Sequence, residues 1–254
     1  MDSNAAMNES FVFFSMLAFT FLGAGLVKGV TGMGLPTVAM GLLVTVMPPA
    51  QAAAMLVIPS FVTNVWQFFA GPARRRLWLR LWPMMFCIVL GTVAGAALLV
   101  RVNPLWSGLA LGGALIVYAG YALLSPALAV PARAERWLSP VVGLVTGAVT
   151  GATGVFVMPA VPFLQALRLD RDELVQALGL SFTVSTVALA VGLAAHGAFR
   201  LEQLGVSGIA IVPALLGMWL GQTVRARISP QRFRLCFLCF LLVLGLELAS
   251  RPFR

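Results

Sequence analysis

Hydroxyl, amide and glycine residues that interrupt long apolar runs are the positions best suited to chemistry in this sequence. They gather in two glycine-rich segments, one early in the chain and one just past its middle. The positions that we assign there to substrate binding are Thr31, Gly32, Gly34, Thr150, Gly151, Thr153 and Gly154. Hydroxyl and backbone N–H groups donate hydrogen bonds, so the pattern predicts a binding site for a small anion.

Two further sets of polar residues follow these segments. Ser60, Asn64 and Gln67 are spaced by four and three residues, so they share one face of a helix. Ser181 and Ser185 hold the corresponding place after the second segment. We assign all five to the substrate site, although hydrogen bonding between membrane helices is an alternative that stays open.

Lys28 is the only lysine of the chain and lies inside the first glycine-rich segment. Its amine could neutralise a bound anion, so it is included among the substrate-binding residues. The interpretation that we favour has the side chain extend from the helix end to the membrane interface.

Catalytic constellations are not evident. His196 is the only histidine, and Glu247 is the only acid deep in an apolar run, so neither a zinc cluster nor a Ser-His-Asp arrangement can be assembled. A Gly-Lys-Ser/Thr phosphate loop is absent, and ATP drive within this chain is not expected. We expect no enzyme activity, no cofactor and no bound metal.

Composition identifies the solvent that surrounds these residues. The chain is 60% hydrophobic and 10% charged, with mean hydropathy +0.98, whereas soluble domains carry about a quarter charged residues. The net charge of +9 comes from arginines in short loops beside apolar runs, where they set topology. Expected partners are therefore membrane lipid and a small anionic substrate, with a homodimer left open and no nucleic acid.

The elements that must position the polar residues are membrane helices. The apolar segments lie near residues 11–47, 52–70, 81–100, 105–124, 138–167, 174–195, 204–224 and 235–250. As one helix the first would extend roughly 55 Å, against a hydrocarbon core of about 30 Å. We expect this segment and 138–167 to turn back at their glycines, the latter as two half-helices.

The sequence also repeats itself. The matched pairs include Gly25 with Gly143 and Gly29 with Gly147, and an Arg-x-x-Pro motif precedes the last apolar segment of each half. This predicts two halves, 1–126 and 127–254, that form one integrated membrane domain. Close helix packing stays open as an alternative role for glycines spaced by four residues.

Charge predicts how the halves are oriented. If both long segments turn back, only Arg101, Arg200, Arg251 and Arg254 of the 17 basic residues lie on one side of the membrane. The positive-inside rule then places both termini outside. The predicted fold class is an all-α polytopic membrane protein with two inverted-topology repeats, each a glycine-broken re-entrant or paired helix followed by three transmembrane helices. Broken helices in inverted repeats are typical of transporters.

With these motifs the chain resembles the sulfite exporter TauE/SafE family of bacterial membrane permeases. The resemblance rests on the duplicated Gly-x-x-x-Gly and Gly-x-x-Gly segments with a following proline and on the two Arg-x-x-Pro motifs. It implies a multi-pass inner-membrane permease that moves small sulfur-containing anions, such as sulfite or organosulfonates, mostly in the direction of export. The alternative is a non-transporting membrane scaffold, assembly factor or sensor subunit.

Overall fold

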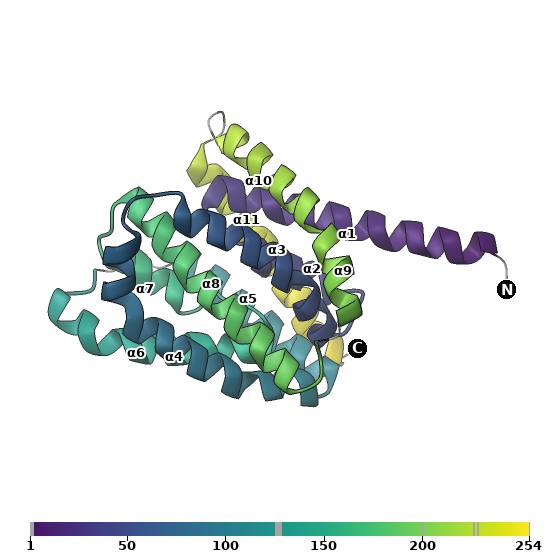
Figure 1. The fold of residues 1–254 in the computed structure, drawn as a ribbon, viewed down its shortest axis with the longest axis horizontal. Coiled ribbons are helices and arrows are strands. Elements are labelled where there is room, and N and C mark those ends of the chain that lie inside the picture. The colour runs from purple at the N-terminus through teal and green to yellow at the C-terminus, as the bar shows by residue number, and fades with distance from the viewer. Residues whose placement is uncertain (1–2, 125–128, 200, 226, 228, 254) are drawn as a thin grey trace.

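The computed structural model describes residues 3–124, 129–199, 201–225, 227 and 229–253, which form helices and no strands (Figure 1). The predicted boundary between the halves at residue 126 lies outside these residues. The helices are α1 (Ser3–Thr31), α2 (Leu35–Leu43), α3 (Pro49–Phe69), α4 (Arg74–Arg101), α5 (Pro104–Leu124), α6 (Ala132–Thr153), α7 (Ala160–Ala166), α8 (Arg171–Ala195), α9 (Leu201–Ile209), α10 (Ile211–Arg225) and α11 (Pro230–Ser250). A 3₁₀ turn, Arg251–Phe253, follows α11.

Seven segments of the described chain are long and apolar enough to cross a membrane. They lie in α1, α3, α4, α5, α8, the α9–α10 pair and α11. The prediction of an all-α polytopic membrane protein is therefore confirmed. The span predicted at 204–224 is interrupted at Ala210, because Pro213 lacks the N–H that would bond to the Ile209 carbonyl.

The first long segment reverses direction at Gly32 and Gly34, as predicted. Both glycines have positive φ, 79° and 101°, a conformation that residues with a Cβ rarely adopt. Helix α1 runs parallel to α10. Helix α2 runs parallel to α11, since Gly34 lies against Phe237 and Gly41 against Leu244. Because α10 and α11 are consecutive spans of opposite direction, α1 and α2 form a hairpin.

The second long segment also turns back, at Gly154 (φ 71°). The backbone N–H of Val130 donates to the Ala166 carbonyl at 3.0 Å, so the segment begins and ends at the same place. The prediction of two half-helices is wrong, because α6 has 22 residues and α7 has seven. Helix α6 begins at Ala132 and continues through a charged first turn that the apolar pattern did not include.

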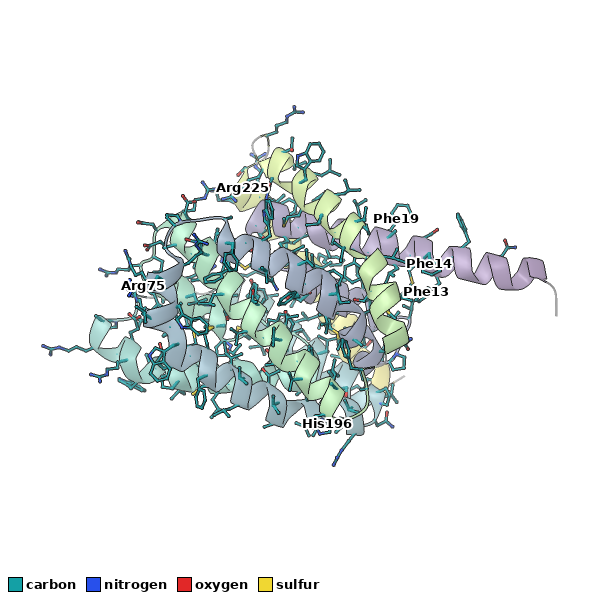
Figure 2. All side chains as sticks on the ribbon, viewed as in Figure 1. Phe13, Phe14, Phe19, Arg75, His196 and Arg225 are labelled. Atoms are coloured by element: carbon teal, nitrogen blue, oxygen red, sulfur yellow. The ribbon has the colours of Figure 1, made fainter. Side chains whose placement is uncertain are left out.

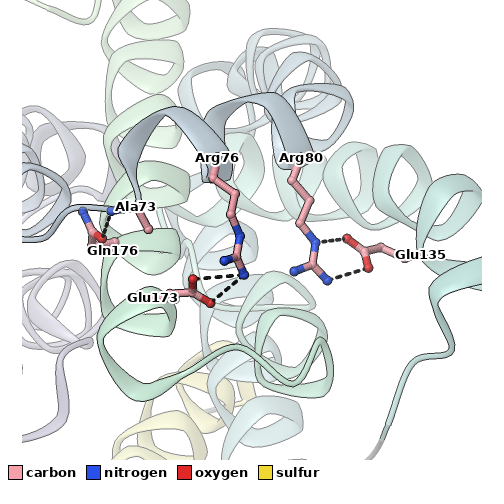
Figure 3. Close-up of polar contacts among 6 residues, drawn as sticks. All are labelled: Ala73, Arg76, Arg80, Glu135, Glu173 and Gln176. Atoms are coloured by element: carbon pink, nitrogen blue, oxygen red, sulfur yellow. Dashed lines mark hydrogen bonds and ion pairs between the residues drawn. The ribbon is translucent and has the colours of Figure 1, made fainter.

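Most described arginines lie at one end of the helix bundle, which we call the arginine end (residues 71–80, 129–136, 167–173 and 225–234). Figure 2 shows Arg75 and Arg225 there and His196 at the opposite end. Ion pairs join three helices at this end: Arg76 of α4 contacts Glu173 of α8 at 3.0 Å, and Arg80 contacts Glu135 of α6 at 2.6 Å (Figure 3). Arg200 and Arg254, expected at the far end, lie outside the described residues.

Candidate functional site

Helical glycines of the two hairpins are sites of close helix packing. Gly29 of α1 lies against α10, where an added Cβ would be 2.2 Å from the Met218 carbonyl oxygen. Gly151 of α6 lies against α4, where an added Cβ would be 2.4 Å from the Thr92 carbonyl oxygen. The packing role that the sequence left open therefore accounts for these two glycines.

The contacts also correct the alignment of the two halves. Gly25 lies seven residues before the positive-φ Gly32, and Gly147 lies seven residues before the positive-φ Gly154, so Gly147 is the counterpart of Gly25. Gly25 packs on Ala214 and Gly147 on Ile88. The sequence alignment, which matched Gly25 with Gly143, is wrong by one helical turn. Glycine recurs at every fourth position of the second segment, so a shift of four residues leaves the sequence match almost unchanged.

Thr31 and Thr153 share two hydrogen bonds at the two breaks, and the Thr31 hydroxyl also lies 2.7 Å from the Met33 carbonyl oxygen. Each hydroxyl donates to the carbonyl four residues before it, at 2.9 Å and 2.7 Å, and accepts from the N–H two residues after it, at 3.2 Å and 3.3 Å. Thr150 donates across the second break to the Val155 carbonyl at 3.2 Å. These hydroxyls therefore hold the backbone of the breaks, and Lys28 occupies the place of Thr150.

Lys28 is buried in the bundle, which contradicts the expectation that it extends to the membrane interface. Its Nζ donates to Thr63 Oγ1 at 3.2 Å and to Asn64 Oδ1. Lys28 lies on the side of α1 that faces the interior of the bundle, so its side chain extends toward α3 and not toward the membrane interface. None of the ion pairs in the described part of the chain involves Lys28.

The predicted polar face of α3 points at this first break. Asn64 contacts Lys28, and Gln67 contacts the break itself. Gln67 Nε2 donates to the carbonyls of Gly32 and Val175, each at 2.8 Å. Asn64 Nδ2 and Ser60 Oγ are buried and have no hydrogen-bond partner among the described residues. The first break thus combines a buried amine with unused hydrogen-bond donors.

The remaining predicted residues lie apart from Lys28. Ser181 and Ser185 are buried on α8 with unpaired hydroxyls, and the hydrogen bonds of the described residues do not connect them to Lys28. Gly154 lies against Met40 of α2, so the second break packs on the first hairpin. Gly34 packs on the Phe237 ring.

A cavity of about 220 Å³ opens beside the first break. Thr31 and Met33 line it at the break, and Arg171, Arg225 and Arg234 line it toward the arginine end. Sequence reasoning counted these arginines for topology and missed them as site residues. The available signal was their clustering at 168–171 and 225–234, but only the fold brings two separate clusters to one cavity.

Comparison with known proteins agrees with this architecture. The model of the sulfite exporter TauE/SafE family matches residues 17–248. The match extends from α1 to α11 and includes both hairpins. No curated protein and no solved structure matches the chain. The extent of the family match shows that the chain belongs to the sulfite exporter TauE/SafE family.

Proposed function

We propose that this protein carries small sulfur-containing anions, sulfite or an organosulfonate, across the bacterial inner membrane in the direction of export. Membership of an exporter family supports transport over the alternatives of a scaffold, an assembly factor or a sensor subunit. The observation that carries the proposal is the buried amine of Lys28 beside the first helix break.

A lysine at this depth calls for a functional explanation, because a charged group in a membrane protein is costly unless it is paired. Lys28 has hydroxyl and amide acceptors and no paired carboxylate in the described chain. Glu247, the acid of α11, lies 3.3 Å from Arg251 instead. An anion beside Lys28 would supply the compensating negative charge and would accept a hydrogen bond from Asn64 Nδ2.

The arrangement of the hairpins supports alternating access by two inverted repeats, 1–126 and 127–254. One hairpin reverses at Gly32 and Gly34 and the other at Gly154, and the second break packs on the first hairpin. In transporters of this kind the substrate site lies where the repeats meet.

The positive-inside rule supports an orientation with the arginine end in the cytoplasm and both termini outside. In a cysteine-free variant of the chain, Arg75→Cys would then resist an impermeant thiol reagent in intact cells, whereas Asn103→Cys at the far end would react. Labelling of the Arg75→Cys variant alone would show that the protein has the opposite orientation.

The decisive experiment compares Lys28→Met with Lys28→Arg in proteoliposomes loaded with radiolabelled sulfite or a sulfonate. Loss of one hydrogen bond to a charged group costs about 1.5–3 kcal/mol, so Lys28→Met should slow transport roughly ten- to a hundredfold. Lys28→Arg should retain part of the rate. Thermal stability of Lys28→Met should be unchanged or higher, because a buried charge is removed. Wild-type transport by Lys28→Met would refute the proposal.

A further inference from the structure

The outer side of the α4–α6 pair is a surface that the proposed function does not use. The two helices run in parallel from the arginine end and pack closely, since added Cβ atoms at Gly143 and Gly147 would lie 2.3 Å from backbone oxygens of α4. Figure 1 shows them side by side along one edge of the molecule. The large apolar side chains that stay exposed in the first half of each helix, which we call the α4–α6 surface, are Trp78, Leu79, Trp82, Phe86, Trp137 and Val141.

Three tryptophans place one end of this surface at the boundary of the membrane. Trp78 and Trp82 of α4 are 49% and 55% exposed, and Trp137 of α6 is 62% exposed. Indole rings of membrane proteins concentrate at the level of the lipid headgroups. Phe86 and Val141 follow one turn further along their helices. The surface therefore extends from the headgroup level at the arginine end into the hydrocarbon.

Exposed arginines lie just outside the tryptophans. Arg75 precedes Trp78 and Trp82 by three and seven residues, so the three side chains share one face of α4. Arg133 precedes Trp137 by four residues on α6. Both arginines are exposed, and Figure 2 shows Arg75 at the arginine end. Because one helical turn advances about 5.4 Å, both lie at the depth of lipid phosphates.

The carboxylates of this region already have partners. Glu135 accepts from Nε and Nη2 of Arg80 at 2.6 Å and 2.7 Å, and Glu173 is paired with Arg76 (Figure 3). The ion pairs of the described residues do not involve the two exposed arginines or Arg136. Uncompensated positive charge above an apolar surface fits a ligand with a negative head and hydrocarbon chains.

The other pair that includes a hairpin helix, α1 with α10, differs in this respect. Its packing is equally close, because an added Cβ at Gly29 would lie 2.2 Å from the Met218 carbonyl oxygen. Helix α1 begins at the far end of the bundle, where its exposed rings are Phe11, Phe14 and Phe19. Residues 3–22 include no arginine, lysine or tryptophan. Close packing and an apolar outer side thus occur in both pairs, whereas the combination of arginine and tryptophan distinguishes the start of the α4–α6 pair.

We propose that the α4–α6 surface binds an anionic phospholipid, with the phosphate at Arg75 and Arg133 and the acyl chains along Phe86 and Val141. Basic residues at neighbouring membrane helices recognise anionic headgroups in this way. Helix α4 precedes the predicted boundary of the halves at residue 126 and α6 follows it, so the lipid would stabilise their contact. The proposal does not depend on which solute the protein carries.

The test measures lipid binding to the purified full chain in detergent by native mass spectrometry, together with a thermal-shift assay. The probes are phosphatidylglycerol and phosphatidylcholine with identical acyl chains. Each arginine near an anionic headgroup contributes about fivefold in affinity, so phosphatidylglycerol should bind roughly twenty-five-fold more tightly. It should also raise the melting temperature further than phosphatidylcholine does. Equal affinity for the two lipids would overturn the proposal.

Matched arginine variants locate the site. Arg75→Gln combined with Arg133→Gln should reduce phosphatidylglycerol affinity to that of phosphatidylcholine. Arg227→Gln combined with Arg232→Gln removes the same charge from exposed residues at the same end, outside α4 and α6, and affinity should change less than about twofold. Both double variants should melt like the wild type in phosphatidylcholine, because none of these arginines forms an ion pair in the described chain. Equal losses in the two double variants would show that only the general positive field attracts the lipid, and would overturn the site.

Discussion

The two helix breaks share a backbone design and differ in chemistry. Each has a threonine hydroxyl that bonds to the carbonyl four residues earlier, followed by a glycine with positive φ, Gly32 in one and Gly154 in the other. Each is preceded by a glycine packed directly on a neighbouring helix, Gly29 or Gly151. One position differs sharply: Lys28 in the first hairpin corresponds to Thr150 in the second.

This difference separates the requirements of the fold from those of binding. Thr150 uses its hydroxyl within its own break, on the Val155 carbonyl. Lys28 instead reaches another helix, where Asn64 accepts its hydrogen bond and Gln67 bonds to the break itself. Small residues thus form both breaks in the same way. Among the described residues of the two breaks, a buried charge and side-chain amides are present only at the first. We infer that the first break binds the anion and the second provides a structural counterpart.

The largest expected effect tests the shared design. Gly29→Ala and Gly151→Ala should each place a Cβ within 2.2 Å and 2.4 Å of a backbone oxygen on the facing helix. Overpacking costs typically 1–3 kcal/mol and more where backbone must move. Both variants should therefore lose most of the monodisperse peak in size-exclusion chromatography after heating.

Gly108→Ala is the matched control, because an added Cβ there has no atom within 4 Å. Its peak should survive heating as well as that of the wild type. If only one of Gly29→Ala and Gly151→Ala were damaging, the two breaks would not share a packing requirement.

Much of the fold could be predicted because bilayer thickness limits helix length. An apolar run from residue 11 to 47 cannot cross as one helix, and glycines are the residues that permit reversal. The length of α6 could not be predicted, since a helix continues through charged residues such as Arg133 and Glu135 once its backbone bonds are formed. The register between the halves was also ambiguous, because glycine recurs with the period of a helical turn.

The site was less predictable because it depends on which helix faces which. The face formed by Ser60, Asn64 and Gln67 follows from spacing alone, but its contact with Lys28 depends on the fold, which brings the Lys28 side chain of α1 within hydrogen-bond reach of α3. The same limit applies to Arg225 and Arg234. The number of arginines in these loops predicts the side of the membrane on which the loops lie. Only the positions of α10 and α11 in the fold bring Arg225 and Arg234 to one cavity.

A second prediction sharpens the chemical difference between the breaks. Asn64→Asp replaces the side-chain amide nitrogen with an oxygen and gives Lys28 a carboxylate within hydrogen-bond reach. The internal ion pair should replace the anion, so transport should fall roughly ten- to a hundredfold while thermal stability stays equal or rises. The measurement is flux in proteoliposomes together with a thermal-shift assay. A faster Asn64→Asp variant would show that Lys28 does not hold the anion.

The smallest expected effect concerns the threonines that the breaks share. Thr31→Val and Thr153→Val preserve side-chain shape and remove the acceptor for one backbone N–H, that of Met33 or Val155. An unsatisfied buried N–H costs about 1–3 kcal/mol, and Met33 is only partly buried, so Thr31→Val should lie at the lower end of this range. Both variants should lower thermal stability modestly and retain anion affinity within about threefold, because their hydroxyls already bond to the backbone. A much larger loss of affinity in Thr31→Val than in Thr153→Val, at equal stability, would mean that the Thr31 hydroxyl turns from the backbone to the anion when the cavity is filled. The threonine itself would then contribute to the chemical difference that separates the first break from the second.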